Sequence, residues 1–172
     1  MSDNTKPVIT VDEMKTRAAA CMTAIEAIQT RLQDGVSAGP AAAQAARLVA
    51  FAFAKQAYTM LENVNGSVQY LSAPPRTPSP EGEEKAPIDK VMDVAEQIGE
   101  KPEQELVSAL VEVAQEVLES LMEQFGVEKE AIPTFLYETN AYILPVIEDM
   151  VASATAKLDE ADRLTAAATP AA

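Results

Sequence analysis

The sequence predicts an all-α protein: a helical bundle of four long helices and one short helix, in which two helical hairpins are joined by a Pro-rich crossover. Alanine, the residue with the highest helix propensity, is abundant along the chain. Apolar residues make up 48% of the 172 residues, which is enough for a core, and they recur at spacings of three and four. Most of the six glycines lie between these periodic segments, where they mark helix ends.

The first helix is predicted to follow Thr10, because Thr10 and Glu13 have the spacing of a capping box. Gly35 marks its end. Between these residues, apolar and small side chains are spaced alternately four and three apart, which is typical of a narrow coiled-coil seam. The predicted seam consists of Met14, Ala18, Cys21, Ile25, Ile28 and Leu32.

The second helix is predicted to begin at Pro40 and to run to about Asn65, with Gly66 as its stop or as a break before a continuation to Leu71. Its small residues form one stripe, at Ala42, Ala46, Ala50 and Ala54. An adjoining stripe that is expected in the core holds Val49, Phe53, Met60 and Val64. A different side carries Leu48, Phe51 and Tyr58. Apolar residues over so much of the circumference predict burial on more than one face.

Residues 72–87 are predicted to be a linker, because five prolines and a Glu/Lys run cannot form a helix or bury a core. The formal net charge of −14 is unevenly divided: residues 1–85 carry 8 basic and 9 acidic side chains, whereas residues 86–172 carry 5 and 18. The predicted organisation is an N-terminal hairpin at 1–71, the linker at 72–87, an acidic helical region at 88–165 and a frayed tail at 166–172.

The acidic region begins with a short predicted helix at 87–98, which a fourth helix at 102–125 follows. The fourth helix has the widest apolar arc of the chain, with Leu110 and Val117 near its centre and a row of glutamates on the opposite face. We expect it to be the most buried element. Aspartate in place of Leu110 or Val117 should then unfold the protein, since an unpaired buried charge is strongly destabilising.

The last helix is predicted to begin near Pro133 and to reach about Leu164. Pro145 should kink it, because proline lacks the N–H that a helix interior needs. Its predicted seam consists of Leu136, Ile143, Ile147, Met150, Ala154, Leu158 and Ala161. Asn140 falls on this seam, where it either specifies the register of the packing or points to solvent.

The residue types that most catalytic and metal sites need are scarce in this chain. There is no His and a single Cys, so His-containing di-iron, zinc and haem sites are excluded. Cys21 lies on the predicted seam of the first helix without a His to activate it, and we expect a buried, inert side chain. No Gly-rich phosphate loop is present. The sequence therefore predicts a protein that is not an enzyme and that uses no cofactor or metal.

The composition also restricts the partners. The excess of acidic residues argues against nucleic acid, because binding phosphates requires concentrated Lys and Arg. No apolar stretch is long enough to span a membrane, and the polar N-terminus does not resemble a signal peptide. We expect a cytoplasmic protein, or one incorporated in a virion made in the cytoplasm. The acidic half is expected to be a solvated surface, or alternatively to meet a basic protein surface or to mimic DNA.

Two aromatic pairs are the candidate partner contacts. Phe51 and Tyr58, with Leu48 beside them, lie on one stripe of the second helix, and Phe135 and Tyr142 lie on one stripe of the last helix. Residues seven apart share a helix face, and aromatic anchors dominate many protein interfaces. Each pair is either ordinary core or a contact with another protein. The function predicted from these residues is a structural or assembly protein, in a homo-oligomer or a larger assembly.

The Ala-rich, acidic, helical composition with its Pro-rich break is similar to that of small virion or assembly proteins of bacteriophages. It also resembles phasins, the helical proteins that coat polyester storage granules. Neither resemblance involves a motif, and neither transfers a functional residue to this chain. Three functions are therefore open: an assembly component, a phasin-like amphipathic coat, and an acidic regulatory binder such as a DNA mimic.

Overall fold

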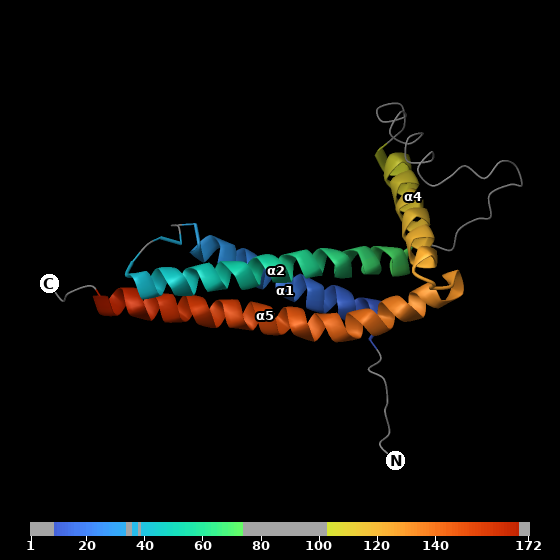
Figure 1. Cartoon of the computed structure of the whole chain (residues 1–172). Helices are drawn as coiled ribbons and strands as arrows, with labels where there is room; N and C mark the ends of the chain where they lie inside the picture. The colour runs from blue at the N-terminus through green and yellow to red at the C-terminus, as the bar shows by residue number, and fades with distance from the viewer. Residues whose placement is uncertain (1–8, 34–35, 38, 74–102, 169–172) are drawn as a thin grey trace, which may run out of the picture. The chain divides into compact units, whose positions relative to one another are not determined.

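A computed structural model describes residues 9–33, 36–37, 39–73 and 103–168, and between 103 and 110 only the side chain of Ala109. This part of the chain contains no strand, which confirms the all-α class (Figure 1). Its elements are α1 (Val11–Arg31), α2 (Ala41–Ser72), α4 (Glu103–Gln124), the short 3₁₀ helix η1 (Lys129–Ala131) and α5 (Ile132–Ala168). The short helix predicted at 87–98 and the linker predicted at 72–87 lie outside the described residues, apart from residues 72 and 73.

The chain folds into two compact units. Unit 1 comprises Met1–Val68 and Tyr137–Ala172, and unit 2 comprises Gln69–Leu136. The predicted boundaries at residues 71 and 88 do not coincide with this division, because α5, from the acidic half, belongs largely with α1 and α2. Segments from the two ends of the sequence therefore build one unit together.

Unit 1 is a three-helix assembly in which α1, α2 and most of α5 lie side by side (Figure 1). Arg17 of α1 is hydrogen-bonded to Glu148 of α5, and Arg31 of α1 is hydrogen-bonded to Asp162 of α5. In both pairs the two residues are 131 positions apart along the chain. A constant separation means that α1 and α5 run parallel. α2 follows α1 after a short connection and runs antiparallel to both.

Each helix of unit 1 buries a seam with alternating spacings of four and three, which is the coiled-coil pattern. On α1 the predicted seam is confirmed: the buried residues are Met14, Ala18, Cys21, Ile25 and Ile28, with Leu32 half-buried at the C-cap. The buried seam of α2, here called the inner seam, consists of Ala43, Arg47, Ala50, Ala54, Ala57, Leu61, Val64 and Val68. The buried seam of α5 consists of Asn140, Leu144, Ile147, Val151, Ala154, Leu158 and Ala161.

The caps at the start of α1 and α2 explain where these helices begin. Thr10 Oγ1 accepts a hydrogen bond from the amide of Glu13 at 3.1 Å, as the capping pattern predicts. Gly39 precedes α2 with a φ of +84°, a conformation that favours glycine. A Cβ at Gly39 would lie only 2.7 Å from Thr165 Oγ1 on α5, so glycine also permits the close approach of the two helices here.

Of the two alternatives predicted for the end of α2, the stop at Gly66 is wrong. The helix continues through Gly66 without a break to Ser72, one residue beyond the alternative end at Leu71, because Val64 and Val68 are buried on either side of the glycine. Packing of this kind outweighs the helix propensity of glycine, which is about 1 kcal/mol poorer than that of alanine. The predicted small-residue stripe is buried at Ala46, Ala50 and Ala54 and exposed only at Ala42. In the adjoining stripe that was expected in the core, Val64 is buried, Phe53 and Met60 are half-buried and Val49 is exposed.

The structure also corrects the predictions for α5. Leu144 and Val151 are buried where Ile143 and Met150 were expected, and the two latter residues are half-buried. The remaining predicted seam residues, including Leu136 in unit 2, are buried. Asn140 is 2% exposed, so the alternative in which it points to solvent is wrong. Pro145 lies inside the helix without ending it.

Unit 2 has a small core around η1. Met122 of α4 packs with Ile132 and Leu136, and the partly buried residues around them are Tyr70, Leu71, Leu118 and Val127. Gly126 has a φ of +77° and ends α4, and the amide of Val127 donates back to the carbonyl of Met122 at 3.0 Å.

The expectation that the fourth helix is the most buried element is wrong for its described side chains. Val113 and Met122 are buried, but Val117 and Leu121 are 44% and 47% exposed. Leu110 lies outside the described side chains. Among the described residues, the inner seam of α2 is more continuously buried than any face of α4, because α2 has both α1 and α5 as neighbours.

Candidate functional site

The side of α2 that faces away from the inner seam is exposed and carries the first predicted contact residues. Six exposed residues, here called the outer seam, follow one another at spacings of four, three, four, three and four: Leu48, Ala52, Lys55, Thr59, Glu62 and Gly66. Phe51 and Tyr58 lie along one edge of this seam and are 50% and 38% exposed. The structure therefore places Leu48, Phe51 and Tyr58 together, outside the core.

The distribution of side-chain sizes on α2 is the reverse of an ordinary amphipathic helix. Between Ala43 and Ala57 the inner seam contains four alanines and one arginine, whereas the outward side of the same stretch carries Leu48, Val49 and Phe51. Small residues on the inner seam let α1 and α5 approach closely. The large apolar residues consequently remain outside, and Leu48 and Phe51, three residues apart, are neighbours on the helix surface, where exposed apolar groups mark interaction surfaces.

The outer seam is nearly neutral. Apart from the buried Arg47, the charged residues of α2 are Lys55 and Glu62, seven positions apart on the outer seam. Within the part of the chain that the structure describes, neither of these two side chains takes part in an ion pair. Both charges are therefore available to a partner.

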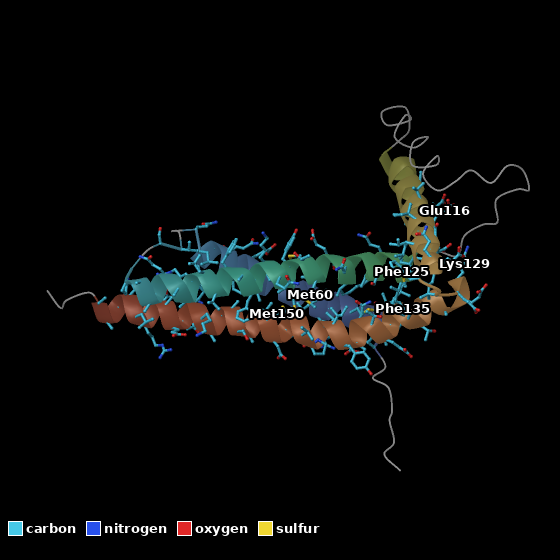
Figure 2. All side chains as sticks on the ribbon, in the orientation of Figure 1. Met60, Glu116, Phe125, Lys129, Phe135 and Met150 are labelled. Carbon is cyan, nitrogen blue, oxygen red and sulfur yellow. The ribbon has the colours of Figure 1, made fainter. Side chains whose placement is uncertain are left out.

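The second predicted pair, Phe135 and Tyr142, is exposed but not brought together as one site. Phe135 belongs to unit 2 and Tyr142 to unit 1, although both lie on α5. Figure 2 shows Phe135 on the first turns of the helix. In unit 1, Val146 lies one turn after Tyr142 and is also exposed, so the outward side of α5 has a short apolar stretch of its own.

Unit 2 carries exposed apolar residues on α4, among them Val117, which was predicted to be buried. Val117, Leu121 and Phe125 follow one another at intervals of four on α4 and its C-terminal end, and Phe125 is 77% exposed (Figure 2). Their spacing is that of a core stripe, so nothing in the sequence separates them from buried residues. On another side of α4, Glu119 accepts from the Tyr70 hydroxyl at 3.2 Å and pairs with Lys129 at 2.9 Å.

A bidentate ion pair joins α1 to α5 and was missed in the sequence. Arg17 Nε and Nη2 donate to the two carboxylate oxygens of Glu148 at 2.7 and 2.8 Å. The hydrogen bond from Arg17 lowers the pKa of Glu148, and the same bond raises the pKa of Arg17. Because the pair is part-exposed, it orients the two helices more than it stabilises them.

A second polar cluster lies where the C-terminal end of α5 meets α1 and α2. Arg31 Nη2 donates to Asp159 and Asp162 at 2.8 and 2.7 Å, and Arg47 Nη2 donates to Asp162 and Thr165 at 3.5 and 3.2 Å. Arginines from the nearly neutral half thus neutralise acids of the acidic half. The positions of these acids are recognisable in the sequence, because Glu148, Asp159 and Asp162 each follow a seam residue directly, where coiled coils carry interhelical ion pairs. This spacing does not say which basic residue each acid meets.

Cys21 is buried, and burial raises the pKa of its thiol, which disfavours the reactive thiolate. The described residues contain no group of three or more Cys, Asp and Glu placed to hold a metal ion. Within that same part of the chain, no helix is both long enough and apolar enough to cross a membrane.

No protein-family model matches the chain, and neither a curated protein nor a solved structure matches it.

Proposed function

We propose that this protein is a non-enzymatic structural or assembly component that acts through protein–protein contacts, and that the outer seam of α2 with Phe51 and Tyr58 is its contact surface. One observation carries the proposal: α2 buries mainly alanines while it exposes Leu48, Phe51 and Tyr58. Aromatic residues in a desolvated interface supply much of its binding energy. A partner would bury the apolar residues of α2 that α1 and α5 leave exposed.

The electrostatics of unit 1 favour α2 over α5 as the contact surface. Residues 137–168 carry six acidic and two basic side chains, whereas the outer seam carries one charge of each sign. A nearly neutral apolar surface is desolvated at less cost than an acidic one. The composition fits a component of a bacteriophage virion or a cytoplasmic assembly, and such a protein would be a homo-oligomer or a part of a larger complex.

A phasin-like coat is the second candidate, and a specific observation favours it. Unit 1 exposes apolar residues on two helices, at Leu48, Val49 and Phe51 on α2 and at Tyr142 and Val146 on α5. A protein that coats an apolar granule would use several such faces at once. An acidic regulatory binder has less support, because Glu148, Asp159 and Asp162 are paired with arginines of α1 and α2.

Site-specific photocrosslinking in the source cells tests the proposal. A benzophenone amino acid replaces Phe51 in one variant and the exposed Gln29 of α1 in a control variant. We expect discrete protein adducts from position 51 only, and their loss when Tyr58→Ser is added. Helical circular dichroism should be unchanged in all variants, because all three positions are exposed.

Each alternative outcome has a defined meaning. Equal adducts at both positions, or no protein adduct at position 51, would contradict a specific contact through α2. Adducts with polymer or lipid in place of protein would support the phasin-like candidate. A loss of helical signal on substituting Phe51 or Tyr58 would show that these rings hold the fold together and do not form a contact surface.

A further inference from the structure

We infer that the partner on the outer seam is a second copy of this chain, with the two α2 helices antiparallel and the symmetry axis between Tyr58 and Thr59. This inference rests on the proposed contact function of α2 and names its partner. The observations that carry it are the exposed apolar face of α2 and the positions of the two charges on that face.

When two copies of the outer seam pack against each other, their charges are complementary in only one of the two orientations. Lys55 and Glu62 are seven residues apart, or about 10 Å along the helix, which is too far for a pair within one chain. In the antiparallel arrangement, Lys55 faces Glu62 of the partner subunit, and the symmetry forms this pair twice. A parallel pair in register would place like charges opposite each other. Charge complementarity therefore selects the antiparallel arrangement.

The same arrangement also brings side chains of complementary size together. It places Phe51 opposite Gly66 of the partner subunit, and a Cβ built at Gly66 meets nothing within 4 Å. Gly66 is exposed and has no side chain, so it leaves room for the aromatic ring. Tyr58 and Thr59 then meet near the axis. The symmetric contact from Phe51 to Gly66 is about 22 Å of helix, enough for several turns of seam-to-seam packing.

A pairing through α5 is electrostatically poorer than one through α2. Two copies of α5 would bring together surfaces with an excess of acidic residues, and exposed Asp149 has no cation beside it in sequence. Like charges brought together at an interface oppose binding. Residues 41–68 of α2 carry two basic residues and one acidic residue, and one of the two basic residues, Arg47, is already engaged with α5. Of these two helices, α2 is therefore the better place for a homotypic contact.

Charge exchange in the full chain is the first test, with the mass and the dimer Kd measured by light scattering and sedimentation. The unchanged chain should be a dimer. Lys55→Glu or Glu62→Lys alone should raise the Kd at least about tenfold, because each creates two like-charge contacts. The K55E/E62K double variant should return to within about threefold of the original. A monomeric chain, or a double variant no better than the singles, would overturn the inference.

Cysteine crosslinking tests the orientation. Thr59→Cys should form an intermolecular disulfide, because position 59 lies next to the axis. Ala52→Cys is the matched control on the same seam, since its two copies would be about 20 Å apart in the antiparallel pair. The unchanged chain reports the background from the buried Cys21. Efficient crosslinking at position 52 would indicate a parallel pair and overturn the antiparallel one.

A substitution at Gly66 separates effects on the dimer from effects on the fold. Gly66→Gln should raise the Tm of unit 1 at low concentration, because glutamine is the better helix former and the site is open. It should also raise the dimer Kd at least about tenfold, because its side chain occupies the place of Phe51 of the partner subunit. An unchanged Kd would contradict the proposed register.

The photocrosslinking experiment separates this inference from the proposed function. Adducts of twice the chain mass at position 51 support both. Adducts with a different protein, together with a monomeric purified chain, support the contact function and overturn self-pairing. The absence of any protein adduct, together with a monomeric chain, overturns both.

Discussion

α1 and α4 have similar apolar periodicity but different burial. On α1 the five residues from Met14 to Ile28 that share the seam are all buried. On α4 the apolar arc is wider, yet Val117 and Leu121 are exposed. The comparison shows that the width of an apolar arc measures how much of a helix could be buried. The number of neighbouring helices determines how much is buried, and α1 has two neighbours in unit 1.

The two units should differ most in how much stability they lose when an aspartate replaces an apolar residue. Leu61→Asp places a carboxylate at a position that is 0% exposed and should unfold unit 1, because the cost is several kcal/mol, on the order of its whole stability. Val117→Asp on α4 should change the free energy of unfolding by less than about 1 kcal/mol. Circular dichroism during urea unfolding measures both. A Val117→Asp protein that is unfolded would show that α4 has a partner surface in solution.

A smaller effect is expected from the buried polar residue of the α5 seam. Asn140→Ala should lower the free energy of unfolding by about 1–3 kcal/mol, because Asn140 is 2% exposed and the loss of a buried polar side chain leaves any hydrogen-bonding partner unsatisfied. Thr139→Ala, one residue away and half-buried, is the matched control and should cost less. Equal effects of the two substitutions would mean that Asn140 contributes only as a helix residue.

The smallest effect should be found at the α1–α5 ion pair, and it should depend on pH. Glu148→Gln should cost about 0.5–1 kcal/mol at neutral pH, since the carboxylate is 41% exposed and partly screened. The lowered pKa of Glu148 means that this contribution is complete above the ordinary value of 4.5 and disappears as the pH falls through the folded-state pKa. The stability difference between the two proteins should therefore close on acidification below pH 4.5.

Urea unfolding of both proteins at neutral pH and at about pH 3 measures this difference. Asp149→Asn is the control, because it removes a neighbouring exposed charge without breaking the pair. A difference between wild type and Glu148→Gln that persists at the lower pH would show that the substitution acts through packing and not through the ionised carboxylate.

Part of the candidate site was predictable from residue spacing. The positions of Leu48, Phe51 and Tyr58 relative to the alanines of α2 predict a separate side of the helix, and the structure places them there. Phe135 and Tyr142 follow the same spacing, yet they fall in different units. Spacing along one helix reports a shared face but not which neighbours that face meets.

The ion pairs between α1 and α5 could not be paired from the sequence, although their residues occupy recognisable positions. Arg17 and Arg31 directly precede seam residues of α1, and Glu148 and Asp162 directly follow seam residues of α5. Any basic helix flank could in principle meet any acidic one. Only the parallel arrangement of α1 and α5, with its separation of 131 residues, selects these partners.

The sequence by itself determined the helical class, the start of α1 at Thr10 and the seam of α1, because capping and periodicity are local properties of the chain. The tertiary structure decided between the two ends that the sequence left open for α2, since the helix passes through Gly66, and it decided which of the several apolar sides of α2 is buried. A helix with apolar residues on several sides has no local preference for which side is buried. The close approach of α1 and α5 favours the small residues on the inside, and it leaves Phe51 and Tyr58 on the outside.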